Sequence, residues 1–212
     1  MIIQIKDLVN DALERTMQKE RRPDPEILKQ QKDRAARELL ETGYDRRFPK
    51  LFDDLTDYIA LWRMDFINTG YMIMGNTGCG KTEAARRLSA LLNIEFVTTS
   101  DLLESFGSQE YYRMIRQPEF FTNKPGPLII DEVGVEPRPL MYYGTKYNVI
   151  ADVFQERYNA FKFHKAITIV TTNLGFEELN DAYGNRVESR CWEMFRAKQY
   201  RGTDCRKVVK AS

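Results

Sequence analysis

The residues with the clearest chemical meaning form one glycine-rich stretch of eight residues. The match to the pattern GxxxxGK[ST] consists of Gly75, Asn76, Thr77, Gly78, Cys79, Gly80, Lys81 and Thr82. It follows the apolar run YMIM and precedes a helical pattern that starts at Glu83, as the pattern requires. Backbone N–H groups of such a loop, with the helix N-terminus, converge on phosphate oxygens. The stretch therefore predicts a nucleoside triphosphate site that includes Glu83, with Lys81 on the β- and γ-phosphates and Thr82 on Mg²⁺.

A second element combines an apolar run with two adjacent acidic residues. The sequence LIIDE at 128–132 has the form of a strand that ends in carboxylates. Asp131 is predicted to hold the Mg²⁺ shell, and Glu132 is placed to polarise a water for in-line attack on the γ-phosphorus. By itself this element is a weak signal, because acidic residues often end strands. Its position after a phosphate loop makes the prediction of nucleotide hydrolysis much stronger.

Three further polar residues have spacing that suits the same chemistry. Asn173 ends the apolar run ITIVTT, at the sheet edge where open α/β sheets bind ligands, and it is predicted to orient the attacking water. An asparagine that opens a turn is the alternative. Arg186 and Arg190 lie four residues apart beside an apolar helical stripe, so they project together. Such an arginine can reach a neighbouring subunit's γ-phosphate; a surface pairing with Glu188 or Glu193 is the alternative.

These residues need a framework of alternating strands and helices, and the hydrophobic pattern provides one. Short apolar runs predict strands at 71–74, 94–98, 128–130 and 167–171. Between them, helical spacing predicts helices at 84–92, 150–161 and 185–195. Alternation of this kind indicates parallel βαβ units. Before them, amphipathic helices are expected at 5–13, 26–41 and 51–66.

Composition limits the remaining possibilities. The chain has 212 residues, 42% of them hydrophobic and 30% charged, which suits one globular core with a small extension. The net charge is +1, so any attraction to nucleic acid must be local. Three cysteines without CxxC spacing and one histidine argue against a disulfide framework and a His-rich metal site. The absence of a long apolar run predicts no membrane contact, and the early charges at the N-terminus favour a cytoplasmic location.

Four motifs in this order, GNTGCGKT, LIIDEVGVE, TIVTTNL and YGNRVESR, resemble the AAA+ ATPases of the DnaC/IstB type. The resemblance covers about residues 70 to 206, and YGNRVESR is its most specific part. It implies an α/β P-loop NTPase fold, a three-layer sandwich around a central parallel sheet, with little or no C-terminal lid. It also implies ATP and Mg²⁺ as cofactors, Asn173 as sensor 1, Arg190 as the trans-acting arginine finger and Arg206 as a sensor-2-like residue. Residues 1–66 are then a helical extension and residues 67–212 the ATPase domain.

The family consists of helicase loaders and transposition helpers, so the resemblance implies single-stranded DNA, a replicative helicase or transposase, and further copies of this chain as partners. Two local patterns suit single-stranded DNA. Residues 186–212 hold eight basic and three acidic residues, and two clusters mix aromatic and basic side chains. These clusters are Tyr111, Tyr112, Arg113 and Arg116, and then Arg138, Tyr142, Tyr143 and Lys146. Solvated loops and partly buried tyrosines are the alternative.

Three other functions fit parts of the sequence. A small-molecule phosphotransferase shares the phosphate loop, but Glu132 directly after Asp131 favours water activation. A GTPase is less consistent, because NKPG at 123–126 lacks the aspartate of the guanine-reading NKxD pattern. A binding module that uses ATP only as a switch stays open, since sequence does not establish turnover.

Overall fold

The computed structural model describes residues 22–44, 47–116, 124–137 and 139–202. The helix expected at 5–13 lies outside these residues. The helices are α2 (Pro25–Glu41), α3 (Pro49–Arg63), α4 (Lys81–Leu92), α5 (Thr99–Glu104), α6 (Gln109–Arg116), α7 (Val149–His164), α8 (Phe176–Tyr183) and α9 (Asn185–Met194). The strands are β1 (Gly70–Gly75), β2 (Glu95–Thr98), β3 (Leu128–Val133), β4 (Leu140–Tyr142), β5 (Thr145–Tyr147), β6 (Thr168–Thr172) and β7 (Phe195–Tyr200).

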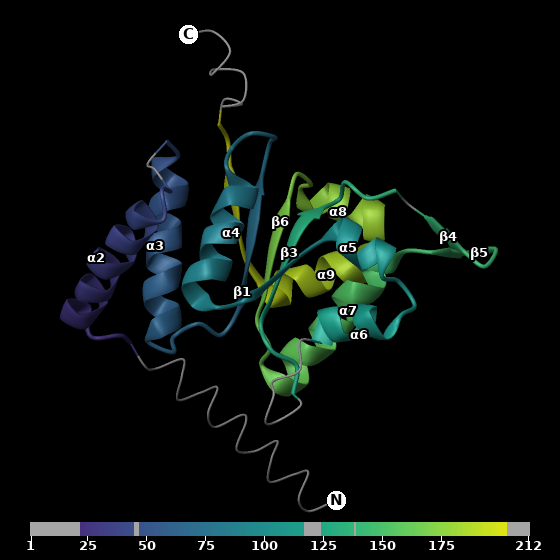
Figure 1. Ribbon diagram of the computed structural model, residues 1–212, viewed down its shortest axis with the longest axis horizontal. Helices are drawn as coiled ribbons and strands as arrows, with labels where there is room; N and C mark the ends of the chain where they lie inside the picture. Colours follow the sequence, from purple (N-terminus) through teal and green to yellow (C-terminus); the bar gives the residue numbers. More distant parts are fainter. Residues whose placement is uncertain (1–21, 45–46, 117–123, 138, 203–212) are drawn as a thin grey trace, which may run out of the picture.

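A five-stranded sheet with the order β2-β3-β6-β1-β7 forms the centre of the molecule, and every neighbouring pair in it is parallel (Figure 1). All six residues of β1 and all five of β6 are buried. Strands that are covered on both faces are apolar along their whole length, which explains the runs YMIM and ITIV. The predicted α/β class and central parallel sheet are therefore confirmed.

Helices cover both faces of the sheet and give the three predicted layers. On one face, Met72, Ile130 and Val170 pack in a core with residues of α5 to α9. On the other face, Tyr71, Ile73 and Ile169 pack with α3 and α4, and α2 lies outside α3 (Figure 1). Successive residues of a strand point to opposite faces. Each central strand therefore supplies both cores.

The helices α2 and α3 match the helical stretches predicted at 26–41 and 51–66. Asp24 caps α2, because its side chain accepts from the N–H groups of Glu26 and Ile27 at 2.9 and 3.1 Å, and Pro25 suits the first helical position. In α3, Leu55 and Ile59 are fully buried in the same core as Ile73 of β1. The helices before residue 66 thus share a core with the sheet, and the boundary between extension and ATPase domain stays a prediction.

A polar network also joins α3 to the sheet. The Tyr200 hydroxyl donates to Asp54 Oδ2 at 2.6 Å, Lys198 pairs with Asp54, and the Tyr71 hydroxyl bonds to that of Tyr200. Tyr58 stacks on the Tyr71 ring with a centroid distance of 5.0 Å. These contacts join α3, β1 and β7, so the first two described helices are held at a defined place beside the sheet.

Candidate functional site

The phosphate loop lies where the sequence predicts it, between the end of β1 and the start of α4. Gly78 and Gly80 have φ values of +83° and +84°, a conformation that glycine adopts without the penalty of a side chain. The first N–H groups of α4 have no partner within the helix, so they are available to an anion at this end. Thr82 lies half-buried in the first turn of α4. This is the local geometry that a phosphate group requires.

Lys81 connects the loop to the neighbouring strand of the sheet. Its Nζ donates to Asn173 Oδ1 at 2.6 Å and to the carbonyl oxygens of Gly75 and Asn76 at 2.7 and 3.0 Å. Burial lowers the pKa of the Lys81 amine, whereas the nearby Cys79 thiol and the Asp131 and Glu132 carboxylates act in the opposite direction. Lys81 and Asn173, predicted from separate motifs, thus lie in contact, and both carboxylates lie near enough to act on the amine.

Asp131 and Glu132 share the end of β3 but have different surroundings. Asp131 is 1% exposed and accepts from the Thr171 hydroxyl at 2.5 Å. Glu132 is exposed and has φ +63°, the left-handed region that residues with a side chain seldom adopt. Its N–H donates to Thr171 Oγ1 at 2.9 Å. The structure therefore presents one buried carboxylate and one solvent-facing carboxylate at the same strand end.

The other residues of the predicted loop have different environments. Thr77 is exposed, whereas Cys79 is fully buried under the loop. The Asn76 amide donates to the Gly202 carbonyl at 2.8 Å and accepts from its N–H at 3.3 Å, so the loop is tied to the end of β7. Glu83 is exposed and pairs with Arg87 along α4. Arg206 lies outside the described residues, and its role stays a prediction.

Arg190 makes its contacts within its own chain. Its guanidinium lies 4.7 Å from the centre of the Tyr158 ring and donates to Gln155 Oε1. Glu188 and Glu193 are engaged elsewhere, since Glu188 accepts from Trp192 Nε1 at 2.6 Å and Glu193 from Lys162 Nζ at 2.8 Å. The pairing with Glu188 or Glu193 that the sequence left open is therefore not what anchors Arg190. Arg186 is exposed on α9.

Sequence reasoning missed Thr171, which bonds to the Asp131 carboxylate and to the backbone N–H of Glu132, although it lies only two residues before Asn173. It also missed Phe48 and a pocket of about 590 Å³ next to the phosphate loop. A side chain at Gly80 would come within 2.8 Å of the Phe48 ring. The pocket is lined by residues of the α3 start and the β7 end: Arg47, Phe48, Pro49, Lys50, Leu51, Gln199, Tyr200, Arg201 and Gly202. These residues carry no motif, because only the fold brings them together.

Both aromatic and basic clusters predicted to bind DNA have environments in the structure that differ from those expected. Tyr111 is buried at 3% exposure, and Arg113 pairs with Glu110, so the expectation that Tyr111 stacks on bases is wrong. The second cluster is not a loop: β4 and β5 form an antiparallel hairpin that projects from the body (Figure 1). Arg138 of that cluster lies outside the described residues. Tyr143 at the hairpin turn is 92% exposed.

The residues that could bind a metal ion next to the phosphate loop are Thr82 and Asp131, which both offer oxygen atoms. Among the described residues there is no group of three or more His, Cys, Asp or Glu side chains that would hold a metal by themselves. Thr82 and Asp131 offer the hard oxygen atoms that Mg²⁺ prefers, and Mg²⁺ usually takes its other ligands from phosphate and water. The residues present thus fit a cation that arrives with a nucleotide. None of the helices in the described ranges has the length and apolar character needed to cross a bilayer.

Comparison with known proteins gives structural matches only. No protein-family model and no curated protein matches the chain. The DnaC helicase loader is 21% identical, with 68% of this chain and 89% of that chain covered and a TM-score of 0.46. DnaI is 19% identical, with 64% and 72% covered and a TM-score of 0.49. Drosophila ORC bound to DNA is 10% identical, and this chain covers 35% of it and matches over 88% of its own length, with a TM-score of 0.44.

At such identities the likeness concerns the fold. The fold itself rests on the parallel sheet, the loop between β1 and α4, and the carboxylates that end β3 one strand away from Asn173. The α/β P-loop fold that the DnaC-type resemblance implies is therefore confirmed by the sheet and the loop themselves. The chain accordingly has a P-loop NTPase fold.

Proposed function

We propose that this chain is a Mg²⁺-dependent ATPase of the AAA+ class that acts in the cytoplasm on DNA, as a helicase loader or a transposase helper does. The observation that carries the proposal is the Lys81–Asn173 contact of 2.6 Å beside Asp131 and Glu132. A cation for phosphate, an amide, a buried carboxylate and an exposed carboxylate meet at one end of the sheet. This is the set of groups that phosphoryl transfer to water uses.

The roles of the four groups follow from their surroundings. With a nucleotide bound, Lys81 would exchange its carbonyl partners for phosphate oxygens, and Thr82 and Asp131 would hold the Mg²⁺, whose chemistry is to neutralise phosphate charge. Asn173, already in contact with Lys81, orients the water. Glu132 faces solvent and accepts the water's proton, which a buried carboxylate engaged by a hydroxyl does less readily. A free water-activating carboxylate favours hydrolysis over transfer to a small-molecule acceptor.

The pocket beside the phosphate loop suits the base and ribose of the nucleotide. Phe48 and Tyr200 line it, together with the cationic residues Arg47, Lys50 and Arg201. Ligand pockets combine apolar walls with a few polar groups, as here. Because α3 and β7 form its walls, the first helices contribute to nucleotide binding.

The first test is nucleotide binding by a Lys81→Ala variant. Loss of a charged hydrogen bond to phosphate costs about 1.5–3 kcal/mol, which is roughly a 10- to 150-fold loss of affinity. Isothermal titration with ATP and Mg²⁺ measures this, with phosphate release measured in parallel. Lys29→Ala, an exposed lysine on α2, is the matched control and is expected to bind ATP normally. Equal affinities for wild type and Lys81→Ala would contradict the proposal.

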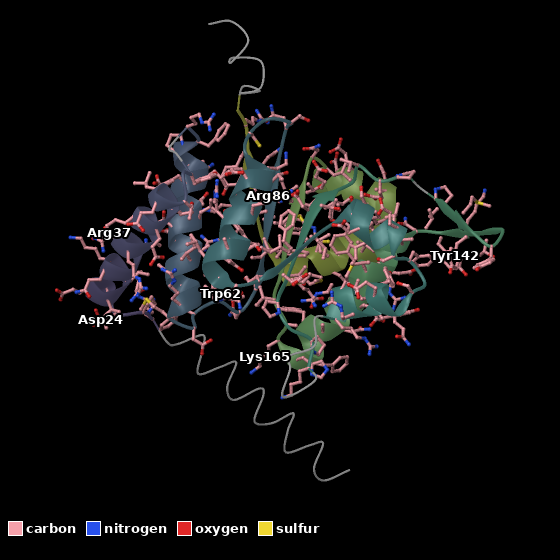
Figure 2. The ribbon with its side chains drawn as sticks, in the orientation of Figure 1. Asp24, Arg37, Trp62, Arg86, Tyr142 and Lys165 are labelled. Carbon is pink, nitrogen blue, oxygen red and sulfur yellow. The ribbon has the colours of Figure 1, made fainter. Side chains whose placement is uncertain are left out.

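The β4–β5 hairpin supports the DNA part of the proposal. Tyr142 packs on Phe106 at 5.1 Å between ring centres, which anchors one face of the hairpin to the body. The other face carries Met141, 57% exposed, opposite Lys146. Tyr143 projects at the turn, and Figure 2 shows Tyr142 on this arm away from the main body. Exposed rings next to cations stack on the bases of single strands.

Tyr143→Ala is therefore expected to weaken binding of single-stranded DNA. Stacking of one base contributes about 1–3 kcal/mol, so the affinity should fall by roughly 5- to 150-fold. Fluorescence anisotropy with a labelled oligonucleotide measures this. Phe163→Ala removes another exposed ring, 78% exposed at the end of α7, and should leave affinity within twofold. The same loss in both variants would show that the hairpin has no special role.

Assembly of several copies is part of the proposal, with Arg190 as the group that reaches a neighbour's γ-phosphate. Within one chain this arginine contacts Gln155 and the Tyr158 ring. Reaching a neighbouring subunit would exchange these contacts for phosphate oxygens, so assembly and nucleotide binding would favour each other. A helicase or a transposase is proposed as the partner because the sequence motifs resemble those of helicase loaders and transposition helpers.

A further inference from the structure

The bulge at the end of β3 places two carboxylate residues opposite one threonine. Ile130 pairs with Val170 and Val133 pairs with Thr172, so Asp131 and Glu132 together face Thr171 across the two parallel strands. A bulge of this kind redirects side chains. Here it turns Asp131 into the protein and Glu132 toward solvent.

Thr171 bonds to both residues of the bulge through a single hydroxyl. Its Oγ1 accepts from the Glu132 N–H at 2.9 Å and donates its proton to Asp131 Oδ1 at 2.5 Å. The hydroxyl has one proton, and the Glu132 N–H supplies its own, so the orientation of the Thr171 hydroxyl is fixed. The side chain is 1% exposed, which keeps water from replacing either bond.

The left-handed backbone of Glu132 is where this bond matters most. A φ of +63° is unfavourable for a residue with a side chain and persists only when surrounding contacts hold it. The bond from the Glu132 N–H to Thr171 is one such contact. Removing it lets the backbone relax, and the carboxylate then leaves its solvent-facing position at the end of β3.

We propose that Thr171 is a positioning residue that sets both carboxylates at once: Asp131 for the Mg²⁺ and Glu132 for the attacking water. The inference rests on the proposed function, which assigns those roles. It adds a residue that contacts neither nucleotide nor water and acts through the two that do. Cation binding and water activation are then coupled through one hydroxyl.

Thr172 provides a matched control at the next position. It is also fully buried, and its hydroxyl donates to the Val133 carbonyl at 2.7 Å and accepts from the Leu174 N–H at 3.0 Å. It bonds to neither carboxylate. Valine has nearly the same shape as threonine, so Thr171→Val and Thr172→Val each remove one buried hydroxyl that makes two bonds.

The experiment compares Thr171→Val, Thr172→Val and Thr171→Ser in the full chain, with thermal melting of each. The first readout is the Mg²⁺ concentration that gives half-maximal binding of a non-hydrolysable ATP analogue. The second is kcat and KM for ATP hydrolysis. Groups that orient a ligand residue are worth roughly 10- to 100-fold in metal affinity or activity. Thr171→Val should raise the half-saturating Mg²⁺ concentration and lower kcat by such factors, with KM within threefold.

The other variants separate positioning from stability. Thr171→Ser keeps the hydroxyl and should restore both readouts to within about threefold of wild type. Thr172→Val should melt at a temperature similar to that of Thr171→Val and keep wild-type kcat and Mg²⁺ dependence. Equal losses in both valine variants, or no rescue by serine, would overturn the inference.

Failure of the proposed function gives a different result. If wild type binds the Mg²⁺ complex of the analogue but releases no phosphate from ATP, hydrolysis is refuted and the Mg²⁺ dependence alone decides the role of Thr171. Under that result, an unchanged half-saturating Mg²⁺ concentration in Thr171→Val overturns the inference. A wild-type chain that binds no nucleotide overturns both.

Discussion

Glu132→Gln is expected to lower the rate of ATP hydrolysis by about 10²- to 10⁴-fold while ATP binding stays near that of wild type. Glutamine has the size and polarity of glutamate but does not accept the water's proton. The backbone bond from residue 132 to Thr171 is unaffected, so the strand end keeps its shape. Phosphate release under steady state, with ATP affinity from titration, measures the two effects separately.

Glu110→Gln is the control, because Glu110 is an exposed carboxylate on α6 that pairs with Arg113. It should keep the wild-type rate. Unchanged turnover in Glu132→Gln would exclude this residue as the base. Undetectable turnover in wild type as well, with ATP bound, would favour the ATP-switched binding module.

Arg157→Met is expected to lower the free energy of unfolding by several kcal/mol, because each buried acceptor left without a donor costs about 1–3 kcal/mol. The Arg157 side chain is fully buried in α7. It donates to Thr168 Oγ1 at 2.8 Å and to the carbonyl oxygens of Ile115, Gly126 and Ile167 at 2.9 to 3.0 Å. Methionine fills part of the space but donates to none of these acceptors, and of them the Ile167 carbonyl still accepts from the Leu128 N–H at 3.0 Å.

The charge of Arg157 makes its hydrogen bonds important for the free energy of unfolding. Burial lowers the pKa of Arg157 to about 9, which is still above neutral pH, so the guanidinium stays charged in the core. The four hydrogen bonds described above go to neutral oxygens of α6, the segment before β3, and the start of β6. One side chain thus holds three chain segments at the amino-terminal end of the sheet.

Urea denaturation followed by circular dichroism measures the loss, with Arg37→Met as control. Arg37 is exposed on α2, and Figure 2 shows it on the outer side of that helix. Its replacement should change stability by less than about 0.5 kcal/mol. A similar small change in Arg157→Met would mean that water satisfies the freed carbonyl oxygens.

The parts of the fold that sequence predicts well are those with a strong local signal. Buried strands such as β1 and β6 have apolar or threonine residues along their length, and the helices between them have clear 3.6-residue spacing. The phosphate loop and LIIDE are each a continuous stretch of sequence, so their chemistry can be predicted without knowledge of the fold. Asn173 was placed correctly at the end of a strand, and its contact with Lys81 joins two motifs that lie far apart in sequence.

Other parts depend on tertiary contacts and have little local signal. The edge strand β7 reads FRAKQY, too polar for an apolar-run criterion, and the β4–β5 hairpin resembles an ordinary aromatic loop. Thr171 is one of several threonines, and only the bulge in β3 places both Asp131 and the backbone N–H of Glu132 against it. A signal for Arg157 did exist, because it falls on the helical stripe that includes Val153 and Phe161.

The Phe48 ring at the start of α3 lies against two glycines, one in the phosphate loop and one just after β7. Side chains at Gly80 or Gly202 would come within 2.8 to 2.9 Å of that ring. A protein that binds α2 and α3 and moves Phe48 relative to these glycines would thereby alter the affinity for ATP. ATP would in turn alter the affinity for that protein by the same factor. This corner would then couple the binding of a partner protein to the binding of ATP.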